Sequence, residues 1–303
     1  MSSVELTVPA AMEPAEGRES AGSVRGHLRF FRNELRLVFF RRRNQLLLGV
    51  VALFPLLIGI GLKAAAPNGG ARGGNGPGAG AAAFFNQLAG NGVFLTFVAL
   101  TLLLILVLPV AVAVISGDSV AGEAGYGTLR YLLAVPAGRT RLLIVKYLAI
   151  VAFAADAVFA VSVVALLVGV ILFPVGPVTL LSGTTVSLAA GLVRVLLVTL
   201  YICAAMAAVG AIGLAISTFT EHAIGAIAAT MILVVASEVV DQIPQFATVA
   251  PYLPTHWWNM FDSLLRTPVD TTTTWHGLLS FGVYAALFWL IAWARFTSGD
   301  VTS

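Results

Sequence analysis

The sequence predicts an all-α polytopic membrane protein: six transmembrane helices with both termini cytoplasmic, preceded by an amphipathic interfacial helix. Three observations support this prediction. First, 59% of the 303 residues are hydrophobic and only 10% are charged, whereas a typical soluble domain has about 25% charged residues. Second, six apolar runs are long enough to cross a hydrocarbon core. Third, lysine and arginine are divided unequally between the two sides that these runs define.

Residues 1–24 are predicted to be a disordered cytoplasmic tail. The first part of this tail is rich in glutamate and has no apolar run like the core of a signal peptide. Residues 25–303 are expected to form a single membrane domain, because the sequence shows neither an internal repeat nor a convincing boundary between two domains.

The segment 25–43 reads RGHLRFFRNELRLVFFRRR. At about 100° per residue, most of its arginines gather on one helix face and its leucines and phenylalanines on another. Such a helix lies in the membrane interface, where each cation near the lipid surface contributes on the order of 1 kcal/mol. A simple positive anchor before the first span explains the arginines at 41–43 equally well. The residues expected to contact lipid headgroups are Arg25, Arg29, Arg32, Arg36 and Arg43.

The apolar runs place the spans near residues 46–63, 93–115, 147–173, 192–216, 223–240 and 278–294. Pro55 in the first span and Pro109 in the second are expected to kink their helices. The long connection 241–277 contains tyrosine and tryptophan residues that suit the membrane interface, and it is predicted to fold back as an external re-entrant segment.

The orientation follows from the cations that flank the spans. The side that includes both termini holds thirteen lysines and arginines, and the other side holds four. Both termini are therefore expected to be cytoplasmic. The net charge is +3, and the basic residues lie beside the apolar runs, so anionic lipid headgroups are their expected partners. No nucleic acid is expected to bind.

The cytoplasmic connection 118–142 contains charged residues, a possible helix cap and a proline that a plain linker would not need. Asp118 and Glu123 present carboxylates at its start, and Arg139 and Arg141 present cations at its end. Between them, Thr128 is a plausible helix cap and Pro136 limits the helix that follows. This short helix would have one apolar and one charged face, as a segment that docks into another protein would.

The stretch GDSVAGEAGYGTLRYLLAVPAGRTRLLIVKY resembles the cytoplasmic signature of ABC-2 type ABC transporter permeases. In that family an acidic residue, Gly-Thr-Leu, Leu-Leu, a proline and a basic cluster follow one another between the second and third spans. The resemblance implies that the ATPase-coupling residues are Asp118, Glu123, Gly127, Thr128, Leu129, Arg130, Leu133, Pro136, Arg139 and Arg141.

The resemblance further implies a permease subunit of an ATP-driven exporter in a bacterial plasma membrane. A second permease copy or a paralogue would complete the path for a drug, a lipid or a lipid-linked glycan. A separate ABC ATPase subunit would bind ATP and Mg²⁺. This chain is expected to be no enzyme and to bind no cofactor, because Lys63 and Lys146 follow Leu62 and Val145 and neither completes the Gly-Lys-Ser/Thr of a P-loop.

Three carboxylates are candidates for the translocation path. Asp156 lies within the third span, where a charge costs at least about 2.5–3.5 kcal/mol, so it should face protein or water. Glu238 and Asp241 lie at the outer end of the fifth span. Each carboxylate also has a purely structural alternative. Asp156 could be a protonated or hydrogen-bonded packing residue, and the other two could simply be solvated at the membrane interface.

The alternative function is a proton-coupled secondary transporter that uses Asp156. Neither repeat symmetry nor paired broken helices favour it. An intramembrane hydrolase is disfavoured because the sequence has no G-x-S-x-G motif and no H-E-x-x-H motif. No metal site is expected, and the single cysteine, Cys203, cannot form an intramolecular disulfide.

Overall fold

The structure is a computed structural model that describes residues 32, 34–65, 91–125, 138–179 and 183–298. The predicted helical class is confirmed, because these residues include six helices that are long and apolar enough to cross a membrane. They are α2 (Arg42–Ala65), α5 (Val107–Gly125), α7 (Arg139–Leu172), α8 (Leu188–Ser217), α9 (Ala223–Asp241) and α10 (Thr271–Ser298). The protein is therefore a multi-pass membrane protein.

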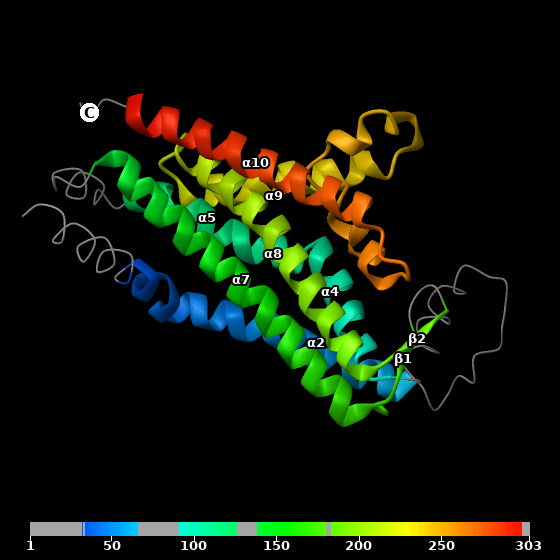
Figure 1. The fold of residues 1–303 in the computed structure, drawn as a ribbon. Coiled ribbons are helices and arrows are strands. Elements are labelled where there is room, and N and C mark those ends of the chain that lie inside the picture. Colours follow the sequence, from blue (N-terminus) through cyan, green and yellow to red (C-terminus); the bar gives the residue numbers. More distant parts are fainter. Residues whose placement is uncertain (1–31, 33, 66–90, 126–137, 180–182, 299–303) are drawn as a thin grey trace, which may run out of the picture.

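The helices run lengthwise between two ends of the bundle (Figure 1). At one end α2 and α7 begin and α5 and α10 finish; we call it the basic end, because Arg41–Arg43, Arg139, Arg141 and Arg295 lie there. At the opposite end lie the short β-hairpin of β1 (Val178–Thr179) and β2 (Thr185–Val186) and the segment between α9 and α10.

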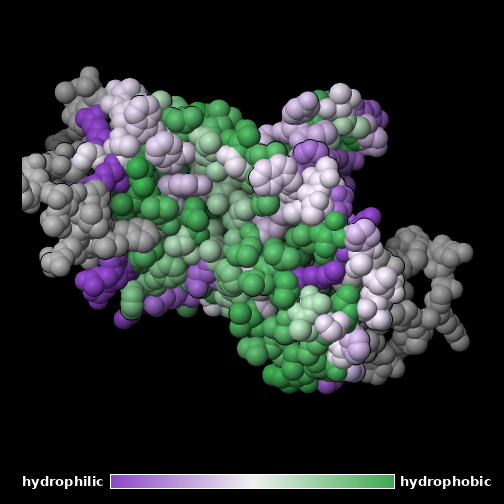
Figure 2. Space-filling model, viewed as in Figure 1, coloured by the Kyte–Doolittle hydropathy of each residue, from purple (hydrophilic) through white to green (hydrophobic). Residues whose placement is uncertain are grey.

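The centre of the bundle is formed by α5 and α8. The most apolar stretch of α8 is 67% buried, whereas that of α2 is 17% buried. Around this centre, α2 packs on α7, α9 packs on α5 and α10 packs on α8. Figure 2 shows that apolar residues cover most of the middle of one face of the molecule, as expected for a surface that meets lipid.

The predicted second span is two helices rather than one. A shorter helix, α4 (Phe94–Ile105), ends just before Leu106, whose backbone (φ −142°, ψ −49°) leaves the helical region. The cause is Pro109, which has no N–H and whose ring collides with the carbonyl four residues earlier, at Ile105. The kink expected from Pro109 is therefore confirmed, whereas α2 continues through Pro55.

The helix α5 continues to Gly125, ten residues beyond the predicted end of the second span. Its polar part is held by Ser217 at the end of α8. The Ser217 hydroxyl donates to the carbonyl of Gly117 (2.9 Å) and accepts from the N–H groups of Val120 (3.1 Å) and Ala121 (2.8 Å). A side chain thus enters the backbone ladder of α5 and joins it to α8.

At the opposite end, α4 and α7 cross with their backbones in contact. A Cβ atom added to Gly92 would overlap the carbonyl oxygen of Gly169, and one added to Gly169 would overlap that of Gly92. Asn91 fixes the neighbouring connection, because its side-chain amide donates to the carbonyl of Pro177 (3.1 Å). Only glycine permits this approach, at Gly169 in α7 and at Gly92 in the turn just before α4.

The segment between α9 and α10 packs on the bundle. It contains three 3₁₀ helices, Pro244–Phe246, Ala250–Tyr252 and Trp258–Leu265, of which the last contacts α8 and α10. Tyr252 is 76% exposed, as expected for an interfacial ring, but the same expectation is wrong for Trp258, which joins the core. The helix α10 begins seven residues before the predicted sixth span.

Asp270 caps the start of α10. Its carboxylate accepts hydrogen bonds from the backbone N–H groups of Thr272 (3.1 Å) and Thr273 (3.2 Å) and from the Thr273 hydroxyl (2.6 Å). These bonds, led by that of the Thr273 hydroxyl, hold the pKa of Asp270 below its usual range. Because the folded-state pKa is lowered, the contribution of this cap to stability is lost as the pH falls through that value.

The close approach of Gly92 and Gly169 predicts that two glycine-to-alanine substitutions will differ in their effect on stability. Gly169→Ala should destabilise the fold by about 1–3 kcal/mol, the usual cost of overpacking a tight contact. Gly61→Ala in α2 meets no atom within 4 Å and should be neutral or stabilising by up to about 1 kcal/mol, because alanine favours the helix. Thermal unfolding of the two purified variants checks this, and equal midpoints would contradict the described crossing.

Candidate functional site: an ion-pair cluster at the basic end

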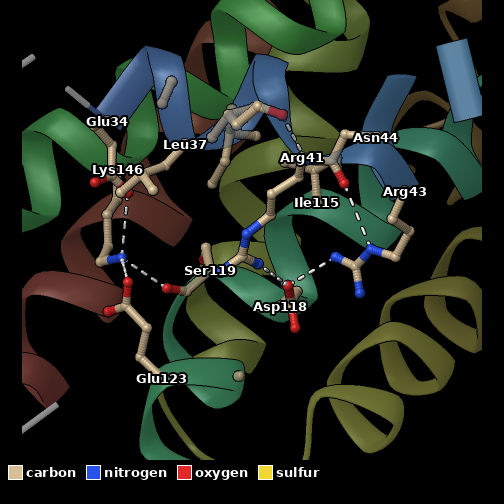
Figure 3. Close-up of a pocket in the computed structure, with 14 residues that line it drawn as sticks. Glu34, Leu37, Arg41, Arg43, Asn44, Ile115, Asp118, Ser119, Glu123 and Lys146 are labelled. Atoms are coloured by element: carbon tan, nitrogen blue, oxygen red, sulfur yellow. Dashed lines mark hydrogen bonds and ion pairs between the residues drawn. The ribbon is translucent and has the colours of Figure 1, made fainter. Parts of the chain in front are cut away.

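Charged side chains from four segments meet around a cavity of about 180 Å³ at the basic end (Figure 3). We call them the basic-end cluster. Its three cations and three carboxylates are Arg41, Arg43, Lys146, Glu34, Asp118 and Glu123. The cluster lies between the segment before α2, the start of α2, the last turns of α5 and the first turns of α7.

Lys146 is the buried centre of one half of the cluster. Its side chain is 2% exposed, and its ammonium donates to Glu123 (2.6 Å), to Glu34 (3.4 Å) and to the backbone carbonyl of Ser119 (2.9 Å). An ammonium has three donors and no acceptor, so these partners use its whole capacity. Lys146 therefore binds α7 to α5 and to the segment before α2.

Asp118 is the centre of the other half. One of its carboxylate oxygens accepts from Arg43 (2.7 Å) and from Arg41 (3.1 Å). The side chain of Asp118 is 12% exposed, whereas both arginines are more than half exposed. The charge on α5 is thus neutralised from the bend at Arg41 and from the first turn of α2.

The bend between this segment and α2 is fixed by Asn44. Residues 34–40 are helical, Arg41 lies at a bend, and α2 begins at Arg42. The buried Asn44 amide donates to the carbonyl of Val38 (2.7 Å), which the bend leaves without its helical partner.

The predicted interfacial helix is helical over residues 34–40, but part of its apolar face was misassigned to lipid. Val38 and Phe39 pack against the protein core, and the Phe39 ring lies 6.3 Å from that of Phe153. Arg43 binds Asp118 rather than facing lipid alone. Arg32 and Arg36 are exposed, so their contact with lipid headgroups stays a prediction. Arg25 and Arg29 lie outside the described residues, as does the tail 1–24.

The predicted loop 118–142 was too long at both ends. Asp118 and Glu123 belong to α5, and Arg139 and Arg141 belong to α7. Their polarity suggested a loop, but partners inside the bundle let them continue the helices. The remaining coupling candidates, Gly127, Thr128, Leu129, Arg130, Leu133 and Pro136, lie in the connection 126–137, outside the described residues.

Arg139 and the cluster face different parts of the bundle. The Arg139 guanidinium donates to the carbonyl of Thr297 (3.0 Å), and the Trp293 indole donates to the hydroxyl of Thr140 (2.9 Å). The first turn of α7 is thus attached to the last turns of α10, while its second turn carries Lys146 to α5.

The three path candidates do not come together at one site. Asp156 is exposed on α7, and no described side chain forms an ion pair or hydrogen bond with it. Asp241 pairs with Nδ1 of His256 (2.6 Å), which attaches the end of α9 to the segment between α9 and α10. Glu238 lies one turn earlier on α9 and interacts with Thr255 of the same segment.

Sequence reasoning missed Glu34 and Ser217, and it noted Arg41 and Lys146 as cations without pairing either with a carboxylate. For Lys146 a signal was available, because a lysine inside the apolar run LLIVKYLAIV needs an anionic partner. For Ser217 no local signal exists. Its partners on α5 are about a hundred residues away, and its hydroxyl resembles any other near a helix end.

The cluster links several segments at one end of the bundle by ion pairs. Its charges are balanced, and among the described residues no group of three or more histidine, cysteine or acidic side chains could hold a metal ion. Its ion pairs connect the segment before α2, the start of α2, the end of α5 and the start of α7, which lie together at one end of the bundle.

Lys146→Met should destabilise the protein, because it leaves the carboxylates of Glu34 and Glu123 without their cation. The expected loss is roughly 2–3 kcal/mol, below the 3–5 kcal/mol of fully buried pairs because both carboxylates are partly exposed. Adding Glu123→Gln should recover part of this loss in a double-mutant cycle. Arg266→Met is the control, since it removes only the exposed Arg266–Asp262 pair and should cost about 0.5 kcal/mol or less. Equal unfolding midpoints for K146M and R266M would contradict the structural role of Lys146.

Comparison with known proteins gives one family. No curated protein matches the sequence. Residues 75–302, which include α4 to α10, match the family described as "Protein of unknown function (DUF2705)". The match covers most of the chain, and the protein therefore belongs to the DUF2705 family.

Proposed function

We propose that this protein is the membrane-spanning permease subunit of an ABC exporter in the plasma membrane of a bacterium. It moves a hydrophobic or amphipathic substrate outward, and a separate ATPase subunit binds and hydrolyses ATP. The proposal places the basic end in the cytoplasm, in agreement with the excess of cations there.

The observation that carries the proposal is the basic-end cluster, which holds both sides of the connection 126–137. This connection contains the centre of the stretch that resembles the ABC-2 signature. Glu123 precedes it on α5 and Lys146 follows it on α7, and the two are joined by a 2.6 Å ion pair. A push on the connection by a partner would move α5 and α7 together instead of spreading them apart.

The displacement would continue into the centre of the bundle through Ser217. Because its hydroxyl bonds three backbone groups of α5, α8 follows any shift of the end of α5. The helix α8 in turn packs along α7 and α10. The basic end is therefore built to pass movement from the connection to most of the spanning helices.

The proposal predicts that an ATPase with a Walker motif co-purifies with the chain in mild detergent. Replacing residues 126–137 by a neutral linker of equal length should remove this subunit, because the contact lies in the connection. The matched control replaces residues 72–83, also of equal length, between α2 and α4. Loss of the ATPase in both variants would indicate misfolding, and its retention when 126–137 is replaced would contradict the coupling role. Absence of any ATPase from the wild-type preparation would contradict the permease proposal itself.

Asp156 supports the presence of a second copy or paralogue beside α7. It lies near the middle of this helix, about 25 Å from either end at 1.5 Å per residue, and it is exposed. A charged carboxylate that faces lipid at this depth costs at least about 2.5–3.5 kcal/mol. In the proposed complex, this face of α7 therefore lines a water-containing path against another subunit.

This placement predicts the reactivity of cysteines in a Cys203→Ala background. Ala152 lies one turn before Asp156 on the same face of α7, and Leu53 is exposed in the middle of α2. A cysteine at position 152 should react several-fold faster with a charged, water-soluble thiol reagent than a cysteine at position 53, because thiolates form only where water reaches. Equally slow reaction at both positions would show that the α7 face meets lipid.

Asp156 also favours the alternative function, proton-coupled secondary transport. A carboxylate that is exposed to a path and has no described partner is suited to bind and release protons. In that case the chain would purify alone and move solute in proteoliposomes under a proton gradient. Asp156→Asn would stop this movement, whereas ATP-driven export with the partner ATPase would tolerate the neutral amide.

A further inference from the structure

The first half of the segment between α9 and α10 lies on the bundle without joining its core. We call residues 243–256 the strap. Residues 244–252 are exposed apart from Ala250, and no side chain of the strap belongs to the hydrophobic core. The second half of the segment, in contrast, places Trp258, Phe261 and Leu264 in that core. The strap is therefore held mainly by polar bonds.

Two of these bonds join neutral groups. Thr255 shares a hydrogen bond with Ser237 of α9 (2.8 Å), and the Tyr284 hydroxyl of α10 donates to the carbonyl of Tyr252. Hydroxyl groups of serine, threonine and tyrosine do not change charge near neutral pH. These two bonds therefore hold the end of the strap equally well in mild acid and in mild base.

The third bond joins groups that can both be charged. Nδ1 of His256 lies 2.6 Å from the carboxylate of Asp241, the last residue of α9, and the two side chains are 21% and 17% exposed. Water therefore reaches the pair, and protons can exchange with it. Histidine is the side chain that normally changes charge between about pH 5 and 8. A hydrogen bond between an imidazolium and a carboxylate is about twice as strong as one between neutral groups.

The end of α9 needs a cation from elsewhere. Glu238 and Asp241 both lie in its last turn, which contains no basic residue, and a helix C-terminus is an unfavourable place for negative charge. Among the described residues, neither carboxyl group forms an ion pair with a lysine or an arginine. Any charge on Glu238 adds to the negative potential around Asp241 and favours the imidazolium form of His256.

The other elements around the strap bring no competing charge to this pair. From α8 comes the Tyr201 phenol, which donates to the carbonyl of Trp257 (2.7 Å). From α10 comes His276, whose ring lies 5.8 Å from that of Trp257 and which forms no ion pair with the described residues. The last 3₁₀ helix brings Asp262, which is paired with Arg266. The Asp–His pair is thus the contact of the strap whose strength depends on pH.

We propose that the pair of Asp241 and His256 is a pH-sensitive latch that holds the strap to the end of α9. At the acidic end of the range, the imidazolium binds the carboxylate and the strap stays closed. As the pH rises, His256 loses its proton, the end of α9 loses its cation, and the strap opens more often. The latch goes beyond the proposed function, because it requires neither an ATPase nor transport.

The test measures hydrogen exchange of the purified full chain in lipid nanodiscs. The amides of Tyr252 and Leu253 donate to carbonyls within the strap, so their exchange reports its opening. Each rate is divided by that of an unstructured chain at the same pH. Protection of the strap should fall several-fold between about pH 5 and about pH 8, while residues 258–265 keep theirs. Equal protection of the strap across this range would overturn the proposal, and this result needs no variant.

Three variants identify the group that titrates. His256→Gln keeps a hydrogen-bond donor but cannot gain charge, so protection of the strap should no longer depend on pH. Asp241→Asn removes the charge that the imidazolium binds and should have the same effect. His276→Gln is the matched control, because this neighbouring histidine has no described carboxylate partner, and it should keep the wild-type dependence. Retained dependence in H256Q, or an equal loss in H276Q, would show that another group is responsible and would overturn the latch.

Discussion

The arrangement of the basic end depends on one buried ammonium. Lys146 is almost fully enclosed, and a charge in that position is tolerated only with anions and carbonyls around it. Its partners come from two other segments, α5 and the segment before α2. The requirement to satisfy one side chain of α7 therefore fixes how these three segments approach one another. The Asp118 pairs then hold the bend at Arg41 and the start of α2 against α5.

Hydropathy predicted the spans well because the helices that form them must satisfy their backbone groups internally and meet lipid. The break at Leu106 also followed from local chemistry, since a proline disrupts the helix four residues earlier. The limits of α5 and α7 were not predictable in this way. Both helices extend into polar sequence because partners from distant segments replace the water that a loop would need.

In the candidate site, too, local sequence predicted some features and not others. Asp118, Glu123 and Arg139 were recognised as functional positions from their charge beside apolar runs, but their secondary structure and partners were not. The structure gives each of them a partner within the chain. They hold the helix ends next to the connection 126–137. In the proposed complex, this connection would supply the contact with the ATPase.

The Ser217 contact also sets an order for assembly in the membrane. Ser217 follows Val120 by 97 residues, so α5 is synthesised well before the hydroxyl that enters its backbone ladder. At about 5–20 residues per second, this delay lasts roughly 5–20 s. During that time the polar half of α5 has neither α8 nor α9 to cover it. The end of α5 therefore completes its packing only after α8 and then α9, the fourth and fifth long helices among the described residues, have entered the bilayer.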